Sequence, residues 1–304
     1  MPTVPPPIFR NMTDSDKHGK LTIKIIMKKI LTSIIVCFAA IAAMAQTADI
    51  EVSYTAMSPN FKNGKVDVKN QYVLLANATE SKFYSPKTEY IDSLNSSPEG
   101  KAIYQEMTRN AYLGGKMDDM PRKDGSYYVV KSFPERKLRY YDSAGLDKFF
   151  YEETPEEWKW TVTDSTKEIL GYECIEATTD FHGRKWNVWF SPEIPVNNGP
   201  WKFDGLPGLI LEAVSEDGQY RFDVTGIQQT NREIPTIYLA EEYEKTSRLD
   251  FLKNKRAFLD NTLSRLNAQL GGVSVIKVED ENGKDISGAI FASRESVDFI
   301  ETDY

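Results

Sequence analysis

Residues 200–212 read P-W-K-F-D-G-L-P-G-L-I-L-E, and the rest of the chain is arranged around them. Pro207 and Gly208 favour a type II turn, because proline presets φ at the second position of that turn and glycine accepts the positive φ of the third. Residues 209–211 follow without a polar side chain, which predicts a strand buried on both faces. We therefore expect a tight turn that leads into the middle of a sheet.

This stretch also resembles the signature of a known family through six consecutive residues, Gly205, Leu206, Pro207, Gly208, Leu209 and Ile210. The flanking positions agree in the same order, namely Trp160, Gly171, Tyr172, Glu173, Cys174, Phe181, His182, Gly183, Arg184, Trp189, Pro195, Gly199, Pro200 and Phe203. The chain is thus similar to the GLPGLI family of secreted proteins from Gram-negative bacteria. It is also similar to a non-catalytic N-terminal module of some glycan-releasing amidases. The family is chiefly of unknown function, so the resemblance implies export and no catalytic residues.

The first 45 residues have the pattern of a targeting segment. From Met27 a short basic start is followed by an apolar core at 30–41 and an Ala-Met-Ala site at 43–45, which is typical of a secretory signal peptide and too short to span a membrane. We expect cleavage after residue 45, no stable transmembrane segment afterwards, and a protein exported to the periplasm or the outer-membrane periphery. Residues 1–26 are interpreted as a misassigned start or a disordered extension, with an amphipathic anchor as the alternative.

Charge and cysteine content narrow the classes of partner. Of the 37 basic and 45 acidic residues, six basic and two acidic ones precede Gln46, which leaves 31 against 43 and a net charge of −12. A chain this acidic is expected to bind no nucleic acid. Cys174 is the one cysteine after the cleavage site, so no intramolecular disulfide can form, and we interpret it as a small buried hydrophobe with a reactive thiol as the alternative.

Hydrophobic alternation and turn residues predict one β-rich domain over residues 46–304. The expected fold is mainly β (α+β): a large curved antiparallel sheet or open half-barrel with one or two packed helices. One helix is expected to begin at Ser97-Pro98, and a second to span residues 246–270. Short strands over 127–163 are expected to form an antiparallel meander. Hairpins are expected across His182-Gly183 and, with a type I′ turn, across Asp217-Gly218, and a last one at 273–292.

Four residues are candidates for contacting a ligand. Trp189 is expected on the opposite face of its strand from Trp186, so its indole is a possible ligand platform, and Trp201 lies beside the signature. Asp204 and Arg184 are expected to grip a polar ligand while Trp189 and Trp201 stack on it. The alternatives are that the indoles pack the core and that Asp204 accepts hydrogen bonds from amides of the turn.

No catalytic or cofactor pattern was found, so no catalytic residue, metal ligand or cofactor is assigned. His182 is the only histidine after residue 45, and a hydrolytic or metal site would have to use it, but its position in a tight turn favours a structural role. The leading hypothesis is a binding or accessory protein for a glycan, peptide or lipid. The alternatives are a hydrolase with an Asp/Glu pair in the concave face, and a protein-interaction partner of an outer-membrane or secretion complex that docks through a sheet edge or the 246–270 helix.

Overall fold

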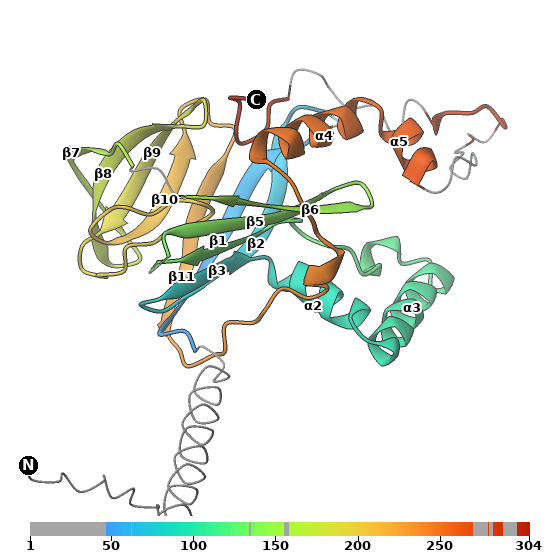
Figure 1. Cartoon of the computed structure of the whole chain (residues 1–304), viewed down its shortest axis with the longest axis horizontal. Helices are drawn as coiled ribbons and strands as arrows, with labels where there is room; N and C mark the ends of the chain where they lie inside the picture. The colour runs from blue at the N-terminus through green and yellow to red at the C-terminus, as the bar shows by residue number, and fades with distance from the viewer. Residues whose placement is uncertain are drawn as a thin grey trace, which may run out of the picture. The chain divides into compact units, whose positions relative to one another are not determined.

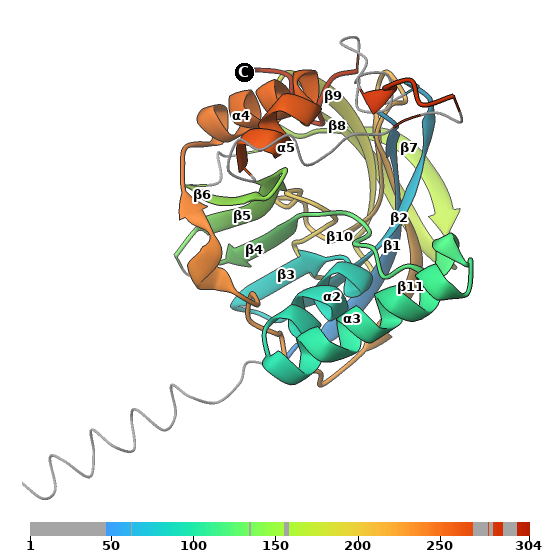
Figure 2. The same ribbon diagram turned by 90° about the vertical axis from the view of Figure 1, so that its right-hand side faces the viewer.

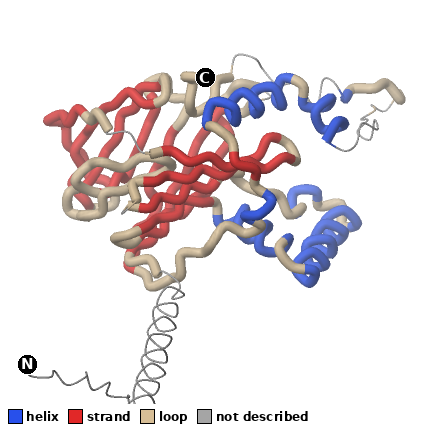
Figure 3. Tube along the Cα trace, viewed as in Figure 1, coloured by secondary structure: helices blue, strands red, loops and turns tan. Residues whose placement is uncertain are grey.

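The computed structural model describes residues 47–61, 63–133, 135–154, 158–269, 279, 282–287 and 297–304. Their strands form one open twelve-stranded sheet, mixed but mostly antiparallel, with four α-helices (Figure 1; Figure 3). In space the strand order is β12-β6-β5-β4-β3-β2-β1-β11-β10-β9-β8-β7. The mainly β fold class is therefore confirmed, with more helices than expected.

The strands and helices have the following bounds: β1 Ile50–Pro59, β2 Val66–Ala76, β3 Glu80–Tyr84, α2 Pro86–Asn95, α3 Pro98–Leu113, β4 Tyr128–Ser132, β5 Lys137–Ala144, β6 Asp147–Glu153, β7 Thr161–Ile169, β8 Tyr172–Phe181, β9 Arg184–Ser191, β10 Leu209–Ser215, β11 Arg221–Gln229, β12 Glu244–Lys245, α4 Arg248–Asp260 and α5 Thr262–Gln269. The expected signal peptide and most of the expected 273–292 hairpin lie outside the described residues.

Strand β10 is an interior strand, as the apolar run 209–211 predicts. It pairs with β9 on one side and β11 on the other, and its first three residues are fully buried. The type II turn at Pro207-Gly208 was wrong, because Gly208 has no positive φ and its N–H instead donates to the Leu206 carbonyl at 2.8 Å, closing a three-residue turn. Glycine is required there because a Cβ would collide with the carbonyl group of Ser191 in β9.

The sheet curls around an aromatic core. Figure 2 shows β3–β6 on one side, the remaining longer strands on the other, and α4 and α5 across the top. On the inner face a row of tyrosine rings is stacked at centroid distances of 5.0 to 5.4 Å, formed by Tyr72, Tyr127, Tyr140 and Tyr151. Phe251 of α4 packs on the same core, so the apolar face of this helix is buried inside the molecule.

The outer face of β2–β4 is buried as well. Val73 and Leu75 alternate with the inner-face residues of β2 and join a second cluster with Tyr128 and Ile234. Helix α2 packs beside β2 on this side (Figure 2). Because both faces are covered, residues 72–76 of β2 are continuously apolar rather than alternating.

Helix α2 was not expected from the sequence, although it has the same start signal as α3. Ser85 caps it by accepting from the Thr88 N–H, and Pro86 occupies its first turn. In α3 the predicted cap is confirmed, since Ser97 Oγ accepts from the Gly100 N–H at 3.0 Å. The Ser85-Pro86 start signal directly follows β3, so the strand pattern conceals it.

Both predicted hairpins are present, but the type I′ turn occurs in the other one. His182 and Gly183 have φ of 48° and 78° and join β8 to β9 as a two-residue type I′ turn. The type I′ turn expected at Asp217-Gly218 was wrong: Gly218 has a positive φ but Asp217 does not, and six residues separate the paired positions Val214 and Arg221. Both hairpins exist as predicted.

The meander expected over 127–163 is broken after β6. Strands β4, β5 and β6 pair in sequence, but β7 pairs with β8 at the opposite end of the sheet, and β6 is instead covered by β12 in the one parallel pairing that the described strands make. The single helix expected at 246–270 is divided at Asn261 into α4 and α5. The Thr262 hydroxyl donates to the Phe258 and Leu259 carbonyls there, competing with the helical hydrogen bonds. No described helix has the length and hydropathy needed to cross a membrane.

Candidate functional site

The connection between β9 and β10, residues 192–208, is called the signature loop below. Buried lysines connect this loop to strands β4 and β6. Lys131 reaches it from β4, and Lys202 reaches from it toward β6. Both lysine side chains are at most 3 % exposed. Burying two ammonium groups is unfavourable unless each is fully hydrogen-bonded, so these contacts fix the loop within the curved sheet.

Lys131 holds the loop by three groups. Its Nζ donates to the Phe203 carbonyl at 2.6 Å and to Asn198 Oδ1 at 3.0 Å, and it lies 3.8 Å from a carboxylate oxygen of Asp204. Burial lowers the pKa of Lys131 to about 8, although the Asp204 charge acts in the opposite direction. A lysine with a lowered pKa beside a cavity is a typical feature of functional sites, and here the same lysine also has a clear structural role.

Asp204 is held by aromatic side chains rather than by the turn. The Trp158 indole N–H donates to Asp204 Oδ1 at 2.5 Å, and the Trp160 indole N–H donates to the Asp204 carbonyl at 2.9 Å. The expectation that Asp204 accepts from amides of the turn was wrong, because the Gly205 N–H donates to Asn197 Oδ1. The side chain of Asp204 is therefore fixed in position and remains 15 % exposed.

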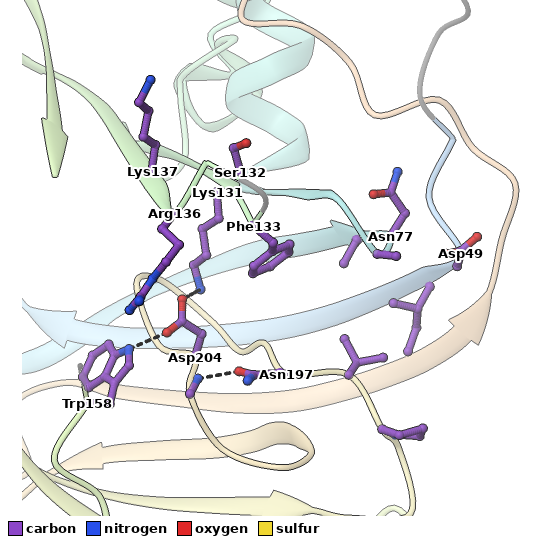
Figure 4. Close-up of a pocket in the computed structure, with 16 residues that line it drawn as sticks. Asp49, Asn77, Lys131, Ser132, Phe133, Arg136, Lys137, Trp158, Asn197 and Asp204 are labelled. Carbon is purple, nitrogen blue, oxygen red and sulfur yellow. Dashed lines mark hydrogen bonds and ion pairs between the residues drawn. The ribbon is translucent and has the colours of Figure 1, made fainter. Parts of the chain in front are cut away.

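A cavity of about 810 Å³ lies against these residues, between the signature loop and the ends of β1, β2 and β4 (Figure 4). Figure 4 shows Arg136, Lys131, Trp158 and Asp204 on one side of it, with Asp49 at the opposite end. The remaining lining residues are Ile50, Ala76, Asn77, Ala78, Ser132, Phe133, Lys137, Pro195, Val196, Asn197 and Gly205. The size is that of a pocket for a small molecule or a short chain segment.

The polar groups of the cavity that have no partner are mainly donors. Within the described chain, the guanidinium of Arg136 and Nδ2 of Asn197 make no hydrogen bond, and Lys137 makes only an exposed ion pair with Glu135 at 3.2 Å. Of the acceptors, Asp204 accepts from Trp158 and Asn77 Oδ1 accepts from the amides of residues 79 and 80, while Asp49 is exposed at the far end of the cavity. The cavity is thus cationic in a strongly acidic protein.

Of the four predicted ligand residues, only Asp204 lines this cavity. Trp201 is fully buried among the aromatic residues of the core, where truncation would leave a large void. Trp189 does lie on the opposite face of β9 from Trp186, as predicted, with Lys167 4.2 Å above its ring. Arg184 is buried and donates to the Phe299 and Ile300 carbonyls and to Asp217. The structure does not bring these four side chains together.

His182 belongs to a separate ion-pair cluster that holds residues 297–304. Its Nδ1 lies 3.2 Å from Asp303, and Arg248 contacts Glu301 at 2.8 Å and Asp303 at 2.7 Å. Lys202 adds contacts with Glu301 at 2.5 Å and Glu153 at 2.6 Å. His182, Glu301 and Asp303 are close enough to share a metal ion, with ligand atoms within 4.8 Å of one another. Because lysine and arginine already neutralise these carboxylates, we assign no metal here.

Burial by itself would raise the pKa of Glu301, but Lys202, His182 and Arg248 hold it below its usual value. A general acid needs the opposite shift, so Glu301 lacks the environment of a general acid. Cys174 is fully buried as predicted, and burial raises the pKa of its thiol to about 11. Neither group is prepared for chemistry near neutral pH.

Sequence reasoning missed Lys131, Phe133, Arg136 and Trp158 as cavity residues. Lys131 lies among the mostly apolar residues 128–133. A lysine in such a strand is a signal for a buried ammonium group with a partner. Arg136 has a φ of 47° in the β4–β5 turn, a backbone conformation that cannot be read from its sequence. Trp158 and Asp204 lie 46 positions apart in the chain, and only the tertiary structure brings them into contact.

Comparison with known proteins supports the family resemblance over a short region. The family model described as "Protein of unknown function (Porph_ging)" matches residues 182–212, which include the His182-Gly183 turn, β9, the signature loop and the start of β10. The resemblance to the GLPGLI family is confirmed over this stretch. No curated protein matches the sequence at a significant level.

The fold is similar to those of several solved structures. PNGF-II in space group P21 shares 14 % identity with a TM-score of 0.46, and the match covers 69 % of this chain and 33 % of that one. PNGF-II in space group C2 shares 14 % identity with a TM-score of 0.44, and the match covers 68 % of this chain and 32 % of that one. This chain therefore spans about a third of PNGF-II. MucB in complex with MucA(peri) shares 11 % identity with a TM-score of 0.28, covering 62 % of this chain and 52 % of that one.

Proposed function

We propose, taking the family match of residues 182–212 as the premise, that this protein is an exported binding or accessory protein of the cell envelope. Its ligand site is the cavity beside the signature loop, and the ligand is a glycan, a peptide or a lipid. The observation that carries the proposal is the cavity of about 810 Å³ whose floor is formed by the family signature region. Its size is within the range of about 300 to 1,000 Å³ that ligand pockets occupy.

The floor of the cavity is built to keep its shape. Asp204 is held by Trp158, and Lys131 is held by Phe203 and Asn198, so the polar groups on this side need no rearrangement when a ligand enters. A preorganised site loses less entropy on binding than a mobile one. Such rigidity is what a binding protein requires, and it supports a role for the signature loop beyond the fold.

The two alternative functions have less support. A hydrolase would need two carboxylates converging on one space, but Asp49 and Asp204 lie at opposite ends of the cavity (Figure 4). Docking through the predicted 246–270 helix loses its main argument, because Phe251 and Leu252 of α4 are buried against the sheet. Strand β7 is an open edge, but its charged side chains and its irregular pairing with β8 are features that discourage edge pairing.

The test is a binding screen with a variant whose cavity is filled. The protein lacking residues 1–45 is titrated with short glycans, peptides and lipids, and binding is followed by calorimetry. Ala78→Trp introduces an indole into the cavity from the exposed β2–β3 turn and should abolish binding without lowering thermal stability. Ala102→Trp, on the exposed surface of α3, is the matched control and should bind normally.

The outcomes separate the proposal from its alternatives. A ligand that binds the wild type and the Ala102→Trp variant but not the Ala78→Trp variant supports a site in the cavity. If a ligand binds all three proteins equally, the site lies elsewhere and the proposal fails. It fails as well if none of the three probe classes binds.

A further inference from the structure

We infer that the cavity binds an amphiphile with one anionic head, a carboxylate or a phosphate, which Arg136 receives while the apolar part lies along Phe133 and Val196. This inference names the ligand chemistry of the same cavity and rests on the proposed function. It follows from which groups of the cavity are free, which are occupied, and where they lie along it.

The first observation is the free donor at one end. The Arg136 guanidinium has no acceptor in the described part of the chain, and it extends to the side of the cavity where Lys131 and Trp158 lie (Figure 4). Asp204 lies on the same side of the cavity but makes no ion pair with Arg136; its carboxylate accepts from Trp158 and faces Lys131. A guanidinium presents its donors in a fork that matches a carboxylate or a phosphate, so an anion is the natural complement of this end.

The second observation is that the opposite end repels an anion. Asp49 is exposed there, and Figure 4 shows it at the far side of the cavity from Arg136. Lys137 lies at the Arg136 end as a second exposed cation, bound only loosely to Glu135. At this end the three cations Arg136, Lys137 and Lys131 outnumber the one carboxylate, Asp204, so the charges along the cavity give the ligand a direction, with its anionic head at Arg136.

The third observation is the apolar surface between these ends. Phe133 is half-buried, projects into the cavity in Figure 4 and stacks on no other ring of the described chain, and Ile50, Ala76, Ala78, Pro195 and Val196 also line the cavity. Groups of this kind offer no hydrogen bonds to a row of hydroxyls. They favour an alkyl or other apolar chain, whose transfer from water is worth about 0.8 kcal/mol for each buried methylene.

The contacts that Trp158 already makes argue against a role of its indole in stacking on a sugar ring. Its ring is stacked with Trp160 at a centroid distance of 5.1 Å and packs on Phe181 at 4.2 Å, and the edge beside Gly205 leaves no room for a Cβ there. Its N–H is used by Asp204. With its ring contacts and its donor already taken, this indole has little left for stacking on a pyranose ring.

The experiment is a calorimetric titration of the chain from residue 46 with octanoate and octyl phosphate. The comparison probes are octanol, octyltrimethylammonium, acetate and inorganic phosphate, all below micellar concentrations. We expect the two amphiphilic anions to bind roughly ten times more tightly than octanol, octyltrimethylammonium or the isolated heads. Comparison of octanoate with octyl phosphate shows which head the site prefers.

Variants locate the two ends of the ligand. Arg136→Gln should weaken the binding of octanoate roughly tenfold and leave the binding of octanol unchanged, because it removes the charge and keeps a polar side chain. Arg109→Gln, on the exposed surface of α3, is the matched control and should bind as the wild type does. Asp49→Asn should alter octanoate binding by less than about twofold if the head lies at the far end.

The results distinguish this inference from the proposed function. If octanol binds as tightly as octanoate, or if Arg136→Gln leaves octanoate binding unchanged, the anionic-head inference is overturned while the cavity remains a binding site. A large gain in octanoate affinity with Asp49→Asn overturns the assigned direction in the same way. If Ala78→Trp abolishes binding of a neutral glycan or peptide and octanoate never binds, the proposed function stands and this inference fails.

Discussion

Replacing Lys131 by methionine should detach the signature loop from β4 and destabilise the whole fold. The ammonium group of Lys131 is the donor for the Phe203 carbonyl and Asn198 Oδ1, and it is 3.8 Å from Asp204. Methionine has a similar length and no charge, so it fills the space and removes only these interactions. Asn198 Oδ1 keeps a donor, the N–H of Gly199, so the loss falls on Phe203 and Asp204.

The magnitude follows from what is left unpaired. A buried carbonyl without a donor costs about 1–3 kcal/mol, and Phe203 is fully buried. Asp204 loses its counter-charge but keeps the Trp158 N–H and some water, which we take as a further cost of roughly 1 kcal/mol. Burial of the methionine side chain returns about 1 kcal/mol. The free energy of unfolding should therefore fall by about 1–3 kcal/mol, which lowers the melting temperature by roughly 2–12 °C.

The assay is a double-mutant cycle of chemical denaturation. Lys131→Met, Asp204→Asn and the double variant are compared with the wild type, and the double variant should be less destabilised than the sum by about 1 kcal/mol. The pH dependence gives a second measure. Burial lowers the pKa of Lys131 from 10.5 to about 8, so between these values the unfolded chain binds the proton more strongly than the folded one. The contribution of Lys131 to stability therefore rises with pH over this window, and the Lys131→Met variant should lack that rise.

Two results would refute this reasoning. A Lys131→Met variant with the denaturation midpoint of the wild type would mean that the lysine does not hold the loop. A stability difference between the two proteins that stays constant from pH 8 to pH 10 would mean that the ammonium is not buried as the structure has it.

Three further predictions concern other parts of the molecule. Gly208→Ala should lower the free energy of unfolding by more than 2 kcal/mol because its Cβ meets backbone atoms, whereas Gly218→Ala, with a positive φ in open space, should cost only about 1 kcal/mol; equal midpoints in urea would contradict this. Glu301 has a lowered pKa, so its pairing stabilises the fold above its unfolded value near 4.5 and is lost as the pH falls further; Glu301→Gln should flatten the loss of stability below that pH, and an unchanged acid profile would count against the ion-pair cluster. Cys174 should react with a thiol reagent only after denaturation, and rapid labelling of the native protein would disprove its burial.

Local features were predictable where neighbouring residues determine the structure. The apolar run 209–211 predicted an interior strand, and Ser97-Pro98 predicted the start of α3, because burial on both faces and end-capping are both expressed within a few residues. The errors at Gly208 and Asp217 have a common cause. A glycine in a turn is selected either by a positive φ or by the close approach of another strand. The sequence shows the glycine but does not show which of the two reasons applies, so the turn type cannot be deduced from it.

The candidate site was less accessible to sequence reasoning. Asp204 was identified because it is a carboxylate between aromatic residues and a turn, and it does line the cavity. Trp189 and Trp201 were selected by residue type, and their surroundings differ: one faces outward beneath Lys167 and the other is enclosed in the core. Arg136, a cavity cation without an acceptor in the described part of the chain, had no sequence signal.

The sequence by itself determined a β-rich fold, the hairpins across residues 182–183 and 217–218 and the interior position of the signature strand, because each depends on periodicity and turn residues within about ten positions. The tertiary structure alone decided that β7 leaves the meander to pair with β8, that Lys131 reaches the signature loop, and that a cationic cavity forms beside it. The physical reason is that strand order and the burial of a charge depend on partners far apart in the chain. Lys131 and Phe203 lie 72 positions apart, and no local pattern records which acceptor a buried ammonium will find.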